Sequence, residues 1–259
     1  MTHRIDNPAP VTPAVLPVAW SPVPGVVAFT TLRHGAGVSR APFDHFNLGA
    51  RCGDDAVAVQ SNRDALVARF ALPSPPRWLR QVHGIQVVVE PEFDAHALDE
   101  PQVDAAITRT RGAVLAILTA DCLPVVFAAD DGSEVAAAHA GWRGLAGGVL
   151  ESTIKAMRTP PDHVVAWLGP AAGPQAYEVG QEVYDAFVLA DADAASAFVA
   201  TRPGHWHADL YALARSRLAA VGITRVQGGG LCTMSDPQRF FSHRRDQRTG
   251  RMATVIYRA

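Results

Sequence analysis

The sequence predicts a mixed α/β fold, a single domain in which layered β-sheets are flanked by helices. Short apolar segments typical of strands alternate with stretches of helical periodicity. The strand-like segments between residues 104 and 140 are apolar at nearly every position, which indicates a sheet covered on both faces. No internal repeat, low-complexity tract or clear linker interrupts the chain. We therefore expect a loosely ordered, proline-rich arm at residues 1–24 and one folded domain over 25–259.

The elements of the first half follow from local patterns. VVAFTT (26–31) reads as a strand, and the following loop, 32–51, lacks periodicity and contains three glycines and a proline. A helix is predicted after Asp54, a suitable N-cap residue. Its apolar face carries Val59, Leu66 and Phe70. Five strands are then predicted, at 85–90, 104–109, 114–120, 124–130 and 134–140. Asp-Asp-Gly at 130–132 is typical of the hairpin turn between the last two.

The second half alternates in the same way. A helix is predicted to start directly after Gly141, because apolar residues there recur with helical period. These residues are Leu145, Val149, Ile154 and Met157. A buried strand at 163–169 leads into a second loop rich in glycine and proline, 169–180. The remaining predicted elements are a helix through Val183 and Phe187, a helix from 209 to 220, and strands near 224–227 and 253–257.

Composition limits the class of protein. The formal net charge of -2 gives no general attraction to nucleic acid or to an anionic membrane. Three widely spaced cysteines do not form a disulfide framework and are typical of a reducing compartment. The N-terminus lacks a secretory signal, and no stretch approaches 18 uninterrupted apolar residues. We expect a soluble cytoplasmic protein, a monomer or small homo-oligomer, with neither nucleic acid nor membrane as a partner.

Three segments place a histidine or cysteine where a predicted strand ends and the chain turns. They are RQVHG (80–84), TADCLPV (119–125) and AAHAGWRG (137–144), which supply His83, Cys122 and His139. Gaps of 39 and 17 residues match no zinc-finger spacing. Catalytic metal sites draw ligands from separate strand ends, and two histidines with one cysteine leave a position for water or substrate. Each residue also has a purely structural alternative when it is considered alone. His83 would cap a turn, Cys122 would fill the core, and His139 would be a core histidine bonded to a carbonyl.

The same three segments, with GPAAGPQAYEVG (169–180) and the ending CTMSDPQRFFSHRRDQRTGRMATVIY (232–257), resemble the YfiH family. Its members are also called laccase-domain or polyphenol oxidase proteins and are described as purine nucleoside phosphorylases. The likeness runs from about Gly25 to Tyr257. It implies a single catalytic domain with an α/β sandwich fold. It also implies a zinc ion held by His83, Cys122 and His139, with copper as an alternative metal in vitro.

The resemblance implies an enzyme whose substrates are purine nucleosides and inorganic phosphate. The family's activities are phosphorolysis of adenosine, inosine and methylthioadenosine to the free base and ribose 1-phosphate or its methylthio analogue, and deamination of adenosine. Deamination needs a carboxylate to transfer protons, and Asp121 is the nearest in sequence to Cys122. In an extended segment the two side chains point to opposite faces, so a structural or ligand-orienting role for Asp121 stays open.

Phosphorolysis needs a site for a dianion, which arginine forks suit. Arg33 and Arg143 both lie beside glycines, and Arg143 falls at a predicted helix N-terminus. Arg244 is a reserve anion contact in a dense basic cluster. Asn47 offers a donor and an acceptor to a base or ribose, and Phe46 a ring for stacking on a purine. The alternatives for these five residues are a surface charge, a turn contact or a place in the core.

Three other functions compete with the phosphorylase. Cys122 with His139 or His83 as base would make a cysteine hydrolase. Copper at the same ligands would make a laccase-like polyphenol oxidase, although one cysteine and two histidines are too few for a multicopper site. A zinc ion with a structural role would make a non-catalytic binding domain.

Overall fold

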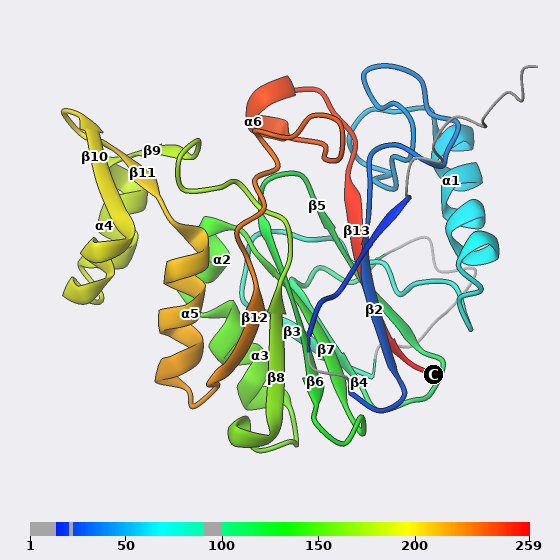
Figure 1. The fold of residues 1–259 in the computed structure, drawn as a ribbon, viewed down its shortest axis with the longest axis horizontal. Coiled ribbons are helices and arrows are strands. Elements are labelled where there is room, and N and C mark those ends of the chain that lie inside the picture. Colours follow the sequence, from blue (N-terminus) through cyan, green and yellow to red (C-terminus); the bar gives the residue numbers. More distant parts are fainter. Residues whose placement is uncertain (1–13, 21–22, 91–99) are drawn as a thin grey trace, which may run out of the picture.

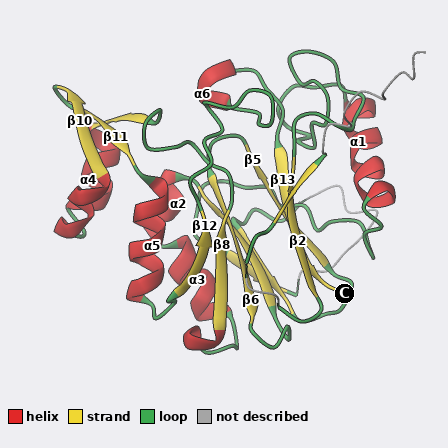
Figure 2. Ribbon diagram, in the orientation of Figure 1, coloured by secondary structure: helices red, strands yellow, loops and turns green. Residues whose placement is uncertain are grey.

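The computed structural model describes residues 14–20, 23–90 and 100–259. Its core is a six-stranded sheet that lies between a layer of helices and a second, four-stranded sheet (Figure 1). Helix α1 covers the outer face of the second sheet, so the order of layers is helix, sheet, sheet, helix. A small third sheet and helix α4 project at one side of the molecule (Figure 2). The predicted mixed α/β sandwich is confirmed.

The order of strands in space differs from their order along the chain in all three sheets. Across the six-stranded sheet lie β12 (Arg225–Gly228), β8 (Val164–Leu168), β6 (Leu123–Ala129), β7 (Val135–Ala140), β4 (Ala105–Thr108) and β3 (Val87–Val89). Across the four-stranded sheet lie β1 (Val15–Pro17), β2 (Val26–Thr31), β13 (Met252–Arg258) and β5 (Val114–Thr119). Across the third sheet lie β10 (Phe198–Arg202), β11 (His205–Ala208) and β9 (Glu178–Gly180).

Apolar side chains fill each interface between layers. The helices are α1 (Ala56–Arg69), α2 (Trp142–Gly147), α3 (Val149–Ala156), α4 (Gln181–Val188), α5 (Leu210–Ala220) and α6 (His243–Asp246), with short 3-10 turns at Pro161–His163 and Ala192–Ala197. Leu145 and Ile154 pack with Phe127 of β6 on the helical face of the large sheet. Val126 on the same strand points the other way, toward Ile117 of the second sheet. The alternation of side chains along β6 explains why nearly every position is apolar.

The predicted loop at 32–51 contains no helix or strand, and α1 follows it, but the predicted N-cap is wrong by one residue. Asp55 caps α1, because its carboxylate accepts a hydrogen bond of 2.8 Å from the backbone N–H of Ala58. Asp54 instead accepts hydrogen bonds from Ser39 and Asn47 of the loop.

The helix predicted after Gly141 is two helices. Gly148 adopts φ +97°, a left-handed conformation that ends α2 and begins α3. The whole third sheet was missed because its strands are short and β10 is exposed along most of its length. Most of the predicted N-terminal arm lies outside the described residues. Within it, Val15–Pro17 form β1, paired with β2, so these three residues are not loosely ordered.

A buried carboxylate holds the end of the large sheet opposite the predicted ligands. Glu134 accepts hydrogen bonds from the backbone N–H groups of Arg158 and Thr159 and from the Thr159 hydroxyl, and it pairs with Arg109 at 3.0 Å. Burial would raise the pKa of Glu134, but these contacts outweigh burial and lower the pKa below its ordinary value.

We expect Glu134→Gln to lower the free energy of unfolding at neutral pH by about 2–3 kcal/mol, the value of charge-assisted hydrogen bonds. A folded-state pKa below the unfolded value of about 4.3 gives stability that is present above that pH. This contribution is lost as the pH falls through the folded-state pKa. Urea unfolding of both proteins should therefore show a gap that narrows on acidification. A gap that is constant with pH would contradict this role for the charge.

Candidate metal centre

Strand pairing brings two of the predicted ligands together. In the antiparallel pair of β6 and β7, Pro124 lies opposite His139. Cys122 immediately precedes β6 and His139 lies near the end of β7, so both reach the same edge of the sheet. His83 comes from the turn that leads into β3, which is separated from β7 only by β4. The three residues therefore converge, as the resemblance implied.

The side chains fit a zinc ion. Their ligand atoms all lie within 4.8 Å of one another. Sγ of Cys122 is 3.6 Å from Nε2 of His83, and the rings of His83 and His139 meet edge to face with centroids 4.8 Å apart. A tetrahedral zinc, with bonds of about 2.3 Å to sulfur and about 2.0 Å to nitrogen, would separate a sulfur and a nitrogen ligand by about 3.6 Å. His139 is buried, Cys122 half-buried and His83 exposed, so the site is open on the His83 side.

One buried carboxylate positions two of these ligands. Oδ1 of Asp104 lies 2.8 Å from Nδ1 of His139, which leaves Nε2 as the nitrogen available to a metal ion. The same carboxylate accepts hydrogen bonds from the backbone N–H groups of Val82, His83 and Gly84, at 3.2, 2.9 and 2.7 Å. These bonds hold the turn in which His83 has a positive φ of 61°.

Cys122 and His139 shift each other's protonation. Burial would raise the pKa of the Cys122 thiol, but the charge of His139, with hydrogen bonds from both histidines, lowers it to about 6. Burial would lower the pKa of His139, but Cys122 and then Asp104 raise it to about 9. Both shifts favour a Cys122 thiolate paired with a protonated His139 in the metal-free protein, and the thiolate is the form of cysteine that binds a metal ion.

Two glycines of HAGWRG allow α2 to start against the centre. A Cβ atom on Gly141 would lie 2.7 Å from Cδ2 of His83 and 3.0 Å from Sγ of Cys122. A Cβ atom on Gly144 would lie 2.9 Å from the carbonyl oxygen of Gly84. Neither contact has room for a side chain, so both positions need glycine for close approach rather than for an unusual backbone conformation.

A cavity of about 400 Å³ adjoins the centre, and its wall includes all three predicted ligands. The volume is in the range of small-molecule sites. Four cationic side chains share the lining, namely Arg51, Arg63, Arg80 and Arg251. Glu100 also lines the cavity and lies 3.2 Å from Arg51 and 3.5 Å from Arg63. The excess of positive charge suits an anionic ligand.

Several contacts hold the Arg63 side chain in place. Its Nε donates to the carbonyl of Leu48 at 3.1 Å, and its guanidinium lies 4.2 Å from the ring centroid of Trp78. The Nη2 atom is buried and has no hydrogen-bond partner among the described residues. A buried donor without a partner costs free energy unless a ligand or water satisfies it. Nη2 of Arg63 is therefore a donor that a bound anion would satisfy.

Asp121 does not face the cavity. One of its carboxylate oxygens accepts from the Thr233 hydroxyl at 2.6 Å, and the other from the backbone N–H of Arg244 at 2.6 Å. Both oxygens are used to tie the C-terminal segment to the end of β5. The carboxylate that orients one of the predicted ligand histidines, His139, is Asp104. The predicted catalytic role of Asp121 is not supported by this geometry.

Phe46 and Asn47 are likewise parts of the framework. Phe46 is fully buried in the core between the second sheet and α1, so no ring face is left for a purine. Asn47 is fully buried too, and its carbonyl oxygen accepts from the backbone N–H groups of Gly49 and Arg251. Its amide donates to Asp54 at 2.8 Å. These contacts engage both residues within the protein and do not support their predicted substrate roles.

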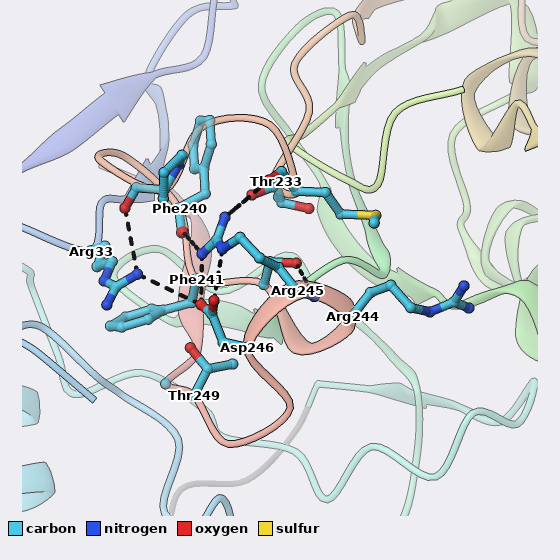
Figure 3. A network of polar contacts seen from close by, with 12 residues as sticks. Arg33, Thr233, Phe240, Phe241, Arg244, Arg245, Asp246 and Thr249 are labelled. Carbon is cyan, nitrogen blue, oxygen red and sulfur yellow. Dashed lines mark hydrogen bonds and ion pairs between the residues drawn. The ribbon is translucent and has the colours of Figure 1, made fainter. Parts of the chain in front are cut away.

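Arg33 belongs to a separate network of polar contacts, drawn in Figure 3. Its guanidinium lies 3.3 Å from Asp44 and 3.6 Å from Asp246, and only 16% of its side chain is exposed. Arg245 pairs with the same Asp246 at 2.7 Å and donates to the carbonyls of Thr233 and Phe240. Arg33 is therefore occupied by two carboxylates and does not line the cavity, contrary to the predicted phosphate contact.

Arg143 and Arg244 are exposed and lie outside the cavity lining. Arg143 stacks on its neighbour Trp142, with 4.4 Å from guanidinium carbon to ring centroid. Arg244 stacks on Tyr177 at 4.9 Å and donates to the carbonyl of Glu178. Burial and then the charge of Cys122 raise the pKa of Tyr177 to about 12. Neither arginine is brought into the cavity with the ligands.

Several residues of the site were missed from the sequence. Gln81 and Arg80 stand inside RQVHG and Arg251 inside the C-terminal motif, so membership of a recognised motif was an available signal. Gln81 fixes the cavity wall through two hydrogen bonds to the backbone of Leu118, at 2.7 and 2.8 Å. Arg63 and Glu100 lie in segments with no such signal.

Replacing Asp104 by asparagine tests how far this carboxylate positions the ligands. We expect metal affinity to fall about 10- to 100-fold, as for other residues that orient metal-bound histidines. Asparagine keeps one acceptor for the turn at 82–84 but loses the charge and one of the two acceptor oxygens. Titration of the metal-free protein with zinc against a chromophoric chelator gives the affinity. An unchanged affinity would show that His139 is oriented without Asp104.

The fold and the site together define a class of protein, an α/β sandwich with a His–Cys–His cluster that could hold a metal ion beside a cationic cavity. The chain belongs to the family described as multi-copper polyphenol oxidoreductase laccase, whose model matches residues 27–259. The family predicted from the sequence motifs is confirmed.

Named relatives cover nearly the whole chain. A purine nucleoside phosphorylase of Xylella fastidiosa strain Temecula1 is 61% identical over 94% of this chain and 96% of its own. Purine nucleoside phosphorylase YfiH of Escherichia coli K12 is 48% identical, over 92% of this chain and 96% of its own. Among solved structures, the Neisseria meningitidis protein NMB0706 superposes with a TM-score of 0.89 at 44% identity, covering 95% of this chain and 99% of that one. The Bacillus licheniformis protein YfiH gives a TM-score of 0.85 at 29% identity, covering 90% and 93%.

Among the helices that the structure describes, none is both long and apolar enough to cross a membrane.

Proposed function

We propose that this chain is a metal-dependent purine nucleoside phosphorylase of the cytoplasm, with its catalytic machinery in a single domain. Adenosine, inosine and methylthioadenosine are the proposed substrates, with inorganic phosphate as the second reactant. The observation that supports this proposal most is that one cavity contains both a candidate metal site and a cationic surface. His83, Cys122 and His139 form part of the cavity wall, and four arginines suited to a dianion form another part. The names of the relatives point to the same reaction.

In this proposal His83, Cys122 and His139 hold the metal, with Asp104 fixing the orientation of His139. Zinc bound there would supply a Lewis acid with an open coordination position. Phosphorolysis forms a bond from a phosphate oxygen to the anomeric carbon of the ribose and breaks the bond from that carbon to the purine nitrogen. The bonding electrons leave with the base, which takes up a proton.

The arginines of the cavity take the place of Arg33 and Arg143 as phosphate contacts. Arg63 offers its free Nη2 donor, and Trp78 and Leu48 hold its guanidinium in one orientation. Arg51 and Arg251 add charge from opposite ends of the chain. A guanidinium that is fixed before the ligand arrives loses little conformational entropy on binding. Glu100 keeps these positive charges in place through its ion pairs.

Deamination of adenosine would require a carboxylate that can transfer a proton near the metal. Asp104 and Asp121 are both engaged in structural hydrogen bonds. Glu100 is the carboxylate in the cavity lining, so we assign this role to Glu100 if the chain deaminates adenosine.

Product analysis of adenosine incubated with the zinc-loaded protein tests the proposal. Adenine and ribose 1-phosphate should appear only when inorganic phosphate is present. Inosine formed without phosphate would show deamination, which should be lost in Glu100→Gln. If neither free base nor inosine forms with zinc and phosphate supplied, the proposed function is wrong.

A second candidate is a cysteine hydrolase, which the lowered pKa of Cys122 favours. Copper-dependent phenol oxidation, from the family's description, is a third. Alkylation by iodoacetamide distinguishes the metal-dependent phosphorylase from the cysteine hydrolase, because a zinc-bound thiolate is protected from alkylation. Rapid alkylation of Cys122 in the zinc-loaded protein would favour the hydrolase. Phenol oxidation that requires added copper and stops when zinc replaces it would favour the oxidase.

A further inference from the structure

A second group of metal-binding side chains lies in the loop between β2 and α1. Ligand atoms of His34, Asp44 and His45 lie within 4.8 Å of one another. The two Nδ1 atoms are 3.1 Å apart, and the imidazole rings are tilted by 58° with centroids 5.1 Å apart. Two imidazole nitrogens bound to one tetrahedral zinc at about 2.0–2.1 Å would lie about 3.3 Å apart. The observed pair is therefore already close to the spacing that a shared metal ion requires.

Backbone hydrogen bonds hold this pair in place. The N–H groups of His45 and Phe46 both donate to the carbonyl of Arg33, at 2.9 and 3.0 Å. The carbonyl of His45 accepts from the N–H of Ser39 at 3.0 Å and from the side chain of Asn62 on α1 at 3.2 Å. The parts of the loop that carry His34 and His45 are thus held together before any ion arrives, which reduces the entropic cost of assembling a site.

The charges beside the two histidines are balanced. Arg33 lies 3.3 Å from Asp44 and 3.6 Å from Asp246, and Asp246 also pairs with Arg245 at 2.7 Å, so two carboxylates face two guanidinium groups. Asp44 supplies an anionic donor beside the two imidazoles.

We propose that His34, Asp44 and His45 form a second metal site, which takes Zn²⁺ or a similar divalent transition-metal ion through two imidazole nitrogens and one carboxylate oxygen. This donor set contains no thiolate and so differs from that of the first centre. His34 and Asp44 are half-buried and His45 is exposed, so the ion can enter directly from solvent. An ion at this site would link His34 to Asp44 and His45 across the loop, beside the Arg33–Asp246 contact. The inference is independent of the proposed catalytic function.

Cobalt titration tests the second site, because Co²⁺ replaces zinc and absorbs visible light. Thiolate ligands add a charge-transfer band in the near ultraviolet that nitrogen and oxygen ligands lack. The wild-type protein, dialysed against Co²⁺, should bind about two ions per chain, one for each donor set. His34→Ala/His45→Ala should bind about one and keep the thiolate band. His83→Ala/Cys122→Ser should also bind about one but lose that band.

His163→Ala is the matched control, because His163 is an exposed histidine 3.1 Å from a carboxylate, Asp130, without a second imidazole. It should bind as many ions as the wild type. Wild-type protein that binds a single ion, or removal of His34 and His45 that leaves the ion count unchanged, would overturn the proposal. An equal loss of cobalt in His163→Ala would overturn it as well, because binding would then be general to surface histidines. Circular dichroism of each variant establishes that the fold is retained.

Discussion

Replacing His83 by alanine should lower the rate of adenosine phosphorolysis about 1,000-fold, since a catalytic metal contributes several kcal/mol and each 1.4 kcal/mol is tenfold in rate. The melting temperature of the metal-free protein should change little. His83 is exposed, and its side chain contacts the two other ligands, Cys122 and His139. The fold therefore depends on this side chain far less than the metal does.

Three measurements on the same preparation test this prediction. Steady-state kinetics give the rate, metal analysis gives the zinc content, and a thermal melt gives the melting temperature. His163→Ala, an exposed histidine far from the centre in sequence and outside the cavity lining, should keep wild-type values. His83→Asn is a useful second variant, because asparagine tolerates the positive φ at this position better than alanine. If His83→Ala unfolds or melts far below the wild type, the metal is structural and the non-catalytic alternative gains support.

The sequence indicates His83, Cys122 and His139 as candidate ligands because each stands in a recognisable motif at a strand end. Cys122 and His139 converge once the β6–β7 hairpin forms in the register that its apolar pattern and turn predict. His83 joins them from the turn before β3, which β4 separates from β7. Asp104 could not be found in this way. It reaches His139 through the pairing of β4 with β7, in which Ala105 lies opposite Ala138, and no local pattern reveals which distant strand is the neighbour.

The structure places Phe46 and Asn47, two of the predicted substrate contacts, in the framework of the protein, for a different reason. The loop that carries Phe46 and Asn47 was correctly predicted as irregular, and irregular loops often bind ligands. In this protein the loop packs back on α1, where Asn62 donates to the carbonyls of His45 and Asn47, so its polar atoms bond to the protein itself. Arg63 on α1 faces the cavity instead, and helical periodicity alone does not say what the polar face of a helix meets.

Gly141 links the start of α2 to the chemistry of the centre. Its φ of -62° and ψ of 157° are accessible to any residue, so alanine fits the backbone without strain. The added methyl group, however, would lie 2.7 Å from the His83 ring and 3.0 Å from the Cys122 sulfur. Those distances are shorter than a van der Waals contact of about 3.5–4.0 Å. Since His83 is the exposed ligand, it is the group that should move away.

We therefore expect Gly141→Ala to fold normally but to lose zinc binding and to fall to about the activity of His83→Ala, roughly 1,000-fold below the wild type. Zinc content, kinetics and thermal melting measure this together. Gly147→Ala is the matched control in the same helix, since its methyl group would meet only the end of the Ile85 side chain, at 3.1 Å. That variant should keep both zinc and activity. Full zinc occupancy in Gly141→Ala would mean that the centre is wider than its three ligands indicate, whereas unfolding would mean that the glycine serves the start of α2 alone.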